Sequence, residues 1–142
     1  MQNAMVLLVE ESPVETTLAC AALALQPDVA VLAVSDVGAA IQVLERQGRP
    51  GSVRIAILGR EALDGRPAEL VRALARSGAH VPVVGVAGGL RAAERARAYD
   101  AGVSALYDRP DGWKAYSALM ARVLAEWRVI RKDSAPLLAH TT

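Results

Sequence analysis

The chain has 142 residues and a formal net charge of +1, with 53% hydrophobic and 22% charged residues. This length and hydrophobic content predict one globular domain with a sizeable core and exclude a disordered chain. The nearly neutral balance argues against nucleic acid or an anionic membrane as the main partner. A lone cysteine, Cys20, excludes an internal disulfide, and no apolar run approaches the roughly 18 residues of a membrane span. We therefore expect a soluble, cytoplasmic protein.

The first predicted strand, Val6–Val9, runs directly into two carboxylates, Glu10 and Glu11. A short, continuous apolar run of this kind is typical of a strand buried on both faces. The next segment, Ser12–Glu15, supplies an N-cap serine, a proline for the first helical position and the glutamate of an S-x-x-E capping box. We expect both carboxylates to lie at the carboxyl end of a strand, the edge at which open α/β sheets bind ligands.

Strand and helix patterns alternate along the rest of the chain. This alternation predicts an α/β protein with a five-stranded parallel sheet, helices on both faces and right-handed crossovers. We expect a single domain over residues 1–132 and a C-terminal tail or truncated linker over 133–142. The elements expected after the first strand are a helix over 13–25, a strand over 29–34, a helix capped by Ser35 and ending before Gly48, a strand over 54–58, a loop over 59–66, a helix over 67–77, a strand over 81–87, a helix over 90–101, a strand over 104–107 and a long helix over 111–132.

Several short motifs, in this order, resemble the receiver domain of bacterial two-component response regulators. The resemblance covers roughly residues 5–124 and implies the flavodoxin-like (βα)5 fold, a three-layer sandwich with a long C-terminal helix. The motifs that carry it are Leu7–Ser12, Ile57-Leu58-Gly59, Leu63-Asp64-Gly65, Val81–Val84, Ala101-Gly102-Val103 and Arg109-Pro110.

The same resemblance implies a degenerate phosphorylation site. In that family an aspartate after the third strand accepts the phosphoryl group, acidic residues hold Mg²⁺, and a Ser or Thr and a Lys bind the phosphoryl oxygens. This chain has Gly59, Ala87 and Arg109 at the matching positions, with Leu106 where many members carry a switching aromatic. The implied protein is a pseudo-receiver that lacks the phosphoacceptor, is not an enzyme and uses no cofactor.

Glu10, Glu11 and Glu61 are weak candidates for a cation site, because hard cations require several oxygen ligands. We expect instead that one of Glu10 and Glu11 pairs with Arg109 while the other faces solvent. The planar guanidinium of Arg109 suits a carboxylate partner. Arg60 and Glu61 are expected in a solvated loop, with a fixed carboxylate that mimics a modified state as the alternative for Glu61.

The last predicted helix carries large apolar residues at spacings of three and four. At 1.5 Å per residue it would be about 30 Å long, more than one sheet face needs. The part up to Leu124 is therefore expected to face the core, whereas Trp127 and Ile130 are expected to overhang and meet a partner. The predicted interface residues are Arg91, Arg95, Trp113, Tyr116, Met120, Val123, Trp127 and Ile130.

The leading hypothesis is a phosphorylation-independent pseudo-receiver. It would act as a protein–protein interaction or dimerisation module in bacterial signal transduction or transcription control. The expected partner is a second copy bound through the fourth and fifth helices, a signalling protein or an output domain, with no membrane and no direct nucleic acid binding. The alternative is a sensor that binds a nucleotide or metabolite over Gly59, Gly88 and Arg109. An enzyme with Glu10 or Glu11 as general base lacks a nucleophile, a metal set and an oxyanion donor.

Overall fold

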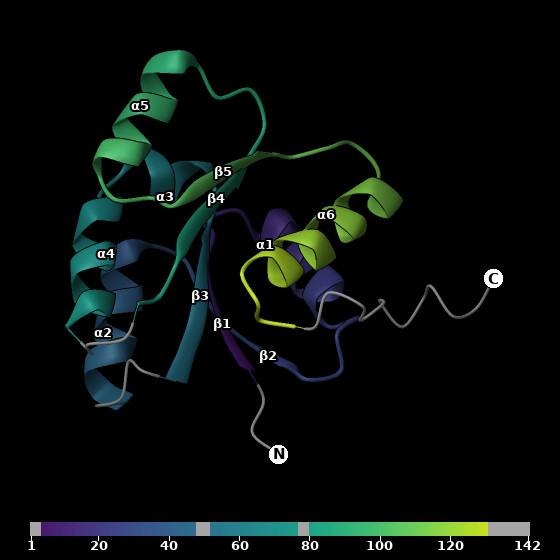
Figure 1. The fold of residues 1–142 in the computed structure, drawn as a ribbon, viewed down its shortest axis with the longest axis horizontal. Coiled ribbons are helices and arrows are strands. Elements are labelled where there is room, and N and C mark those ends of the chain that lie inside the picture. The colour runs from purple at the N-terminus through teal and green to yellow at the C-terminus, as the bar shows by residue number, and fades with distance from the viewer. Residues whose placement is uncertain (1–3, 48–51, 77–79, 131–142) are drawn as a thin grey trace.

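The computed structural model describes residues 4–47, 52–76 and 80–130, which form a single parallel sheet with helices on both faces (Figure 1). The order of the five strands is β2-β1-β3-β4-β5, and every neighbouring pair is parallel. This confirms the predicted fold. The strands are β1 (Ala4–Val9), β2 (Val29–Val34), β3 (Val53–Leu58), β4 (Val83–Ala87) and β5 (Ala105–Asp108).

Two layers of helices cover the sheet (Figure 1). The α1 helix (Pro13–Leu23) and the α6 helix (Trp113–Glu126) lie on one face. The other face carries α2 (Val37–Gln47), α4 (Pro67–Ala75) and α5 (Ala92–Asp100). The short α3 helix (Arg60–Asp64) follows β3 directly, where the sequence predicted a loop.

Side chains of strand β1 pack into both halves of the core, because successive side chains point to opposite faces of a strand. Val6 and Leu8 belong to the buried cluster under α1 and α6, whereas Leu7 and Val9 belong to the cluster under α2 and α4. The prediction that β1 is buried on both faces is confirmed.

The prediction that β2 is also buried on both faces is wrong. The residues of β2 are only half-buried, and Ala33 is exposed. The strand order explains the difference, since β2 lies at one edge of the sheet and pairs with β1 alone.

The C-terminal helix is shorter than predicted. It ends at Glu126, and Arg128 takes a left-handed conformation with φ 61° that turns the chain back. The amide nitrogens of Val129 and Ile130 then donate to the carbonyl oxygen of Leu124 at 2.8 and 3.3 Å. Residues 131 and 132, as well as the predicted tail over 133–142, lie outside the described residues.

The reversal corrects the predicted overhang. Trp127 and Ile130 are partly buried and pack against the core under α1 and α6. The indole Nε1 of Trp127 donates to the hydroxyl of Tyr107 at 2.9 Å, and that hydroxyl donates to Glu126 Oε2 at 2.9 Å. These two residues therefore close the domain instead of projecting from it.

Three further residues predicted at an interface lie in the core. Tyr116, Met120 and Val123 are only 5%, 1% and 0% exposed, so a partner cannot reach them. Trp113 is different, because 38% of it is exposed at the start of α6.

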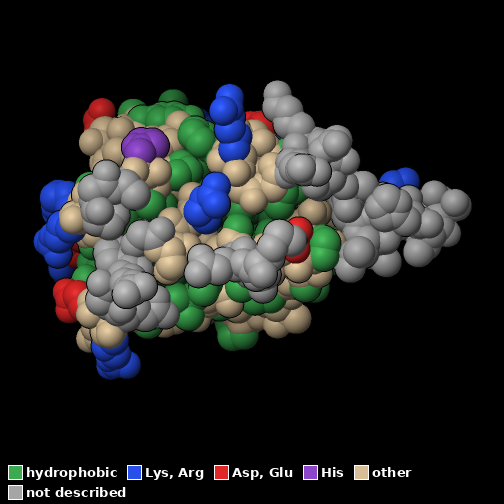
Figure 2. All heavy atoms as spheres, turned by 60° about the horizontal axis from the view of Figure 1, so that its bottom comes forward, with side chains coloured by type: hydrophobic (Ala, Val, Ile, Leu, Met, Phe, Trp, Pro, Cys, Tyr) green, Lys and Arg blue, Asp and Glu red, His purple; other side chains and the backbone are tan. Residues whose placement is uncertain are grey.

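No helix within the described ranges is long and apolar enough to cross a membrane. The face of the molecule in Figure 2 shows charged side chains scattered among apolar and uncharged ones. Neither sign of charge forms a continuous field on that face, in keeping with the net charge of +1.

Candidate functional site at the strand ends

The carboxyl ends of the strands bring together most of the residues that the sequence singled out. Glu10, Ala87 and Arg109 line a pocket with a volume of about 200 Å³, into which Glu15 and Arg60 also reach. Gly59 lines a smaller cavity that shares Glu10 and Arg109 with this pocket. The backbone places Gly59 beside the end of β1, because its amide donates to the carbonyl oxygen of Val9 at 2.9 Å.

Glu10 occupies the space beside Gly59. A Cβ atom at position 59 would overlap Glu10 Oε1 and lie 2.7 Å from Glu10 Cδ. Real Cβ atoms do not come this close to other heavy atoms, so a side chain at position 59 would have to displace the Glu10 carboxylate. The space in which a side chain at position 59 would begin is therefore filled by a carboxylate that follows the neighbouring strand, β1.

The Glu10 carboxylate is held by the start of α1. Its Oε2 accepts a hydrogen bond from the amide of Ser12 at 3.0 Å. Burial raises the pKa of Glu10, and the nearby charges of Glu61 and Glu15 raise it further, while the Ser12 hydrogen bond opposes the shift. Only half of the predicted capping box forms, because Ser12 Oγ accepts from the Glu15 amide at 3.3 Å but the Ser12 amide binds Glu10.

Arg109 pairs with Glu15, so the predicted pair with Glu10 or Glu11 is wrong. The Nε of Arg109 donates to Glu15 Oε2 at 2.7 Å, with the two side chains 25% and 35% exposed. The guanidinium carbon lies 4.9 Å from the centroid of the Tyr116 ring, within range of a cation–π contact. Burial is the main cause that raises the pKa of Tyr116 to about 12, so its ring stays neutral under Arg109.

Arg60 also departs from its prediction, since it is not part of a solvated loop. Its guanidinium lies 3.2 Å from Glu94 Oε2 and also donates to the carbonyl oxygen of Gly88. Glu94 Oε1 in turn accepts from the amide of Arg91 at 2.8 Å, a bond that lowers the pKa of Glu94. Arg60 thus connects α3, the loop after β4 and α5.

Leu106 is packed inward over β4. A Cβ atom on Gly85 would lie 2.7 Å from Leu63 Cδ1 and 2.8 Å from Leu106 Cδ2, so the two leucines meet above this glycine. Their contact needs the absence of a side chain at position 85 and fixes α3 against β4 and β5.

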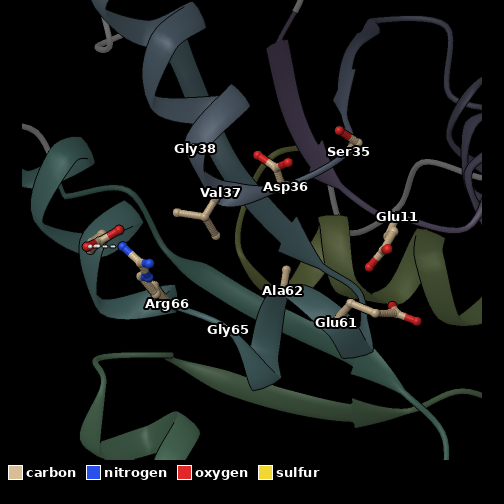
Figure 3. A pocket seen from close by; sticks show the side chains of 10 residues that line it. Glu11, Ser35, Asp36, Val37, Gly38, Glu61, Ala62, Gly65 and Arg66 are labelled. Atoms are coloured by element: carbon tan, nitrogen blue, oxygen red, sulfur yellow. Dashed lines mark hydrogen bonds and ion pairs between the residues drawn. The ribbon is translucent and has the colours of Figure 1, made fainter.

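The three weak candidates for a metal site are divided between two pockets. Glu10 lines the pocket at the strand ends, Glu11 lines a neighbouring pocket of about 350 Å³, and Glu61 borders both. Figure 3 shows Glu11, Glu61 and Asp36 among the side chains that line the neighbouring pocket. Within the described residues, no group of three or more His, Cys, Asp or Glu side chains could hold a metal ion.

Asp36 is a residue that the sequence reasoning missed. Its Oδ1 accepts from the Ala39 amide at 2.7 Å and so caps α2, the role predicted for Ser35. The signal was present, because aspartate is as good an N-cap residue as serine.

No family model matches the sequence, and a search of curated proteins found no match. Solved structures do match over nearly the whole chain. The phosphorylated cyanobacterial phytochrome response regulator RcpA has a TM-score of 0.70 at 19% identity, covering 94% of this chain and 98% of its own. The signal receiver domain of the putative response regulator NarL from Mycobacterium tuberculosis scores 0.67 at 16% identity, covering 90% and 98%. HP1043, an orphan response regulator of H. pylori, scores 0.67 at 14% identity, covering 90% and 100%.

These similarities define the class of the molecule. It is a doubly wound α/β protein, and its fold is that of response regulator receiver domains. The resemblance drawn from the sequence motifs is confirmed at the level of the fold.

Proposed function

We propose that this chain is a phosphorylation-independent receiver-like module that acts in signalling through contacts with other proteins. The observation that carries the proposal is the filled position at Gly59, where the Glu10 carboxylate takes the space of a side chain. A glycine offers no nucleophile for an acyl phosphate.

The remaining groups at the strand ends support the same proposal. Ala87 has no hydroxyl that could bind a phosphoryl oxygen. Arg109 already has Glu15 as its partner, and Arg60 already binds the carbonyl of Gly88 in the loop after β4. These contacts exist without any modification of the chain, so no phosphorylation is needed to form them.

The ligand-sensor alternative depended on empty space over Gly59. That space contains the Glu10 side chain, and Arg109 is engaged with Glu15. The pocket of about 200 Å³ beside Gly88 and Arg109 is bordered by three carboxylates, Glu10, Glu15 and Glu61, which makes it a poor site for an anionic nucleotide, and we favour the interaction module.

Intact-protein mass spectrometry after incubation with Mg²⁺ and acetyl phosphate tests the proposal. We expect no acyl phosphate adduct, whereas a receiver domain with its aspartate, treated in parallel, should be modified. Fluorescence of Trp113 and Trp127 should be unchanged by beryllofluoride with Mg²⁺. A stoichiometric adduct, or a saturable fluorescence change at low beryllofluoride concentration, would overturn the proposal.

A homodimer through α5 and α6 stays a prediction. Arg91 and Arg95 are tied within the chain, the latter to Asp108 at 2.7 Å. The exposed aromatic side chains of the two helices are Tyr99 on α5 and Trp113 at the start of α6. Sedimentation velocity of the chain and of the Trp113→Ala variant measures it, and a monomer at all concentrations would contradict it.

A further inference from the structure

We propose that the groove between α4 and α5 binds an acidic segment of a partner protein, with Arg72 and Arg97 as its charged anchors. This inference rests on the proposed function, because it names the kind of partner that the module takes. The groove lies on the sheet face opposite α1 and α6, away from the pocket that contains Glu10 and Arg109.

The groove has the composition of a peptide-binding surface. Its volume is about 340 Å³, and its apolar lining comes from Leu63, Pro67, Ala68 and Ala101. Three arginines and two carboxylates complete the lining. An apolar surface with a few charged groups binds side chains of both kinds.

The charges within the groove are unevenly matched. Arg66 lies 3.5 Å from Glu69 and is thereby paired. Arg72 and Arg97 are exposed, and within the described part of the chain neither forms an ion pair or a side-chain hydrogen bond. Their planar guanidinium groups are suited to bidentate pairing with carboxylates.

Helix α5 shows the contrast within a single element. Arg91 and Arg95, which do not line the groove, have carboxylate partners within the chain at 3.2 and 2.7 Å. Only the arginine that α5 turns into the groove, Arg97, is left without one among the described residues. Arg72 and Arg97 are therefore both in the groove and available to carboxylates of another molecule.

An acidic peptide fits this groove better than a nucleic acid does. Asp64 and Glu69 also line it, so its unpaired positive charge among the described residues is confined to Arg72 and Arg97 and does not form the continuous track that a phosphate backbone needs. A peptide can place carboxylates at Arg72 and Arg97 and apolar side chains over Pro67 and Ala68.

The walls of the groove are fixed before any partner arrives. Arg60 holds α3 to α5 through Glu94. At the other end, a Cβ atom on Gly102 would lie 3.0 Å from Val71 Cγ1, so α4 and the turn after α5 approach closely at this glycine. Gly102 has φ +103°, a backbone conformation that other residues rarely adopt. Rigid walls lower the entropic cost of binding.

The test uses a short fluorescein-labelled peptide with the repeat Glu-Glu-Leu and the whole chain. Fluorescence anisotropy should show saturable binding that weakens as salt concentration rises. The double variant Arg72→Gln, Arg97→Gln should bind the peptide about tenfold more weakly than the native chain does. The matched control is Arg76→Gln, which removes an exposed arginine at the end of α4 outside the groove and should leave the affinity unchanged.

Amide chemical shifts recorded during the titration locate the peptide. The largest changes should fall on the α3–α4 junction and on α5. Absence of saturable binding, an equal loss in Arg76→Gln, or the largest shifts outside these elements would overturn the inference. Beryllofluoride with Mg²⁺, added in a separate experiment, distinguishes the two proposals. If the peptide does not bind and no beryllofluoride adduct forms, only the proposed peptide groove is overturned. If an adduct forms, the proposal of phosphorylation independence is overturned.

Discussion

Two arginines flank the Glu10 and Gly59 position, and they are used differently. Arg109 is anchored by one carboxylate and one aromatic ring, both from helices that pack on the same sheet face. Arg60 is anchored by a backbone carbonyl and by Glu94, whose side chain is 8% exposed. The Arg109 corner is therefore part of the packed core, whereas the Arg60 corner ties α3 to the loop after β4 and to α5 through polar contacts.

This difference separates stability from positioning. Removing Arg109 exposes a partly buried carboxylate and the face of a core tyrosine, so the cost should appear in the free energy of unfolding. Removing Arg60 releases the loop at Gly88, so the change should appear mainly in local order.

The largest effect is expected for Arg109→Ala. The loss of the Glu15 pair and of the Tyr116 contact should lower the free energy of unfolding by about 1–3 kcal/mol. Urea denaturation measures it. Arg109→Lys should recover part of the loss, because it keeps the charge but not the planar stacking. Equal stability of Arg109→Ala and the native chain would place this corner outside the core.

Gly59→Asp should destabilise the chain by about 1–2 kcal/mol. The new side chain would displace Glu10 from the Ser12 amide and add a charge beside Glu10, Glu15 and Glu61. Gly59→Ala is the control, since it adds only the steric part and should cost less. If the aspartate variant proves as stable as the native chain, Glu10 does not depend on the empty position.

Glu10→Gln should change how stability depends on pH. The pKa of Glu10 is raised from its ordinary value of 4.5, so the folded state binds its proton more tightly than the unfolded state. Ionisation of Glu10 therefore lowers the free energy of unfolding as the pH rises from about the ordinary pKa through the raised pKa of the folded state. Glu10→Gln should be more stable than the native chain at pH 7, and the difference should vanish at about pH 4. Thermal melting curves of both proteins, recorded from pH 4 to pH 7, measure this difference. A stability difference that does not change with pH would contradict the prediction.

Arg60→Gln should have the smallest effect on global stability, about 1 kcal/mol or less. Hydrogen exchange should nevertheless quicken at the amides between Ala87 and Arg91, because the loop loses its tie to α3. Arg66→Gln is the control, as its pair with Glu69 is 78% and 41% exposed. Unchanged exchange in this loop would show that Arg60 does not position it.

The sequence predicted the strands well where both faces are buried. Continuous apolar runs identify strands of this kind, for example β1. The alternation of strands and helices then determines the fold class. An apolar run does not reveal where its strand lies in the sheet. For this reason β2 was expected to be buried on both faces, although it lies at an edge. The end of α6 was missed because a left-handed Arg128 carries no sequence signal of the kind glycine gives.

At the site, the sequence predicted which residues meet but not which of them pair. Backbone topology alone brings Glu10, Gly59 and Arg109 to one edge. Pairing depends on side-chain direction, and Glu15 was assigned to a capping box although its carboxylate reaches Arg109. Arg60 was missed for a related reason, since the five-residue α3 helix that aims it was expected to be a loop.

The overlap between Glu10 and position 59 has a consequence for how this site can change. The two positions are coupled, so the effect of a residue at one depends on the residue at the other. An aspartate at 59 alone meets Glu10, and a short residue at 10 alone leaves the Ser12 amide without its acceptor. Only both changes together give a side chain at position 59 room, so an aspartate avoids the overlap there only in a variant that also has a shorter residue at position 10.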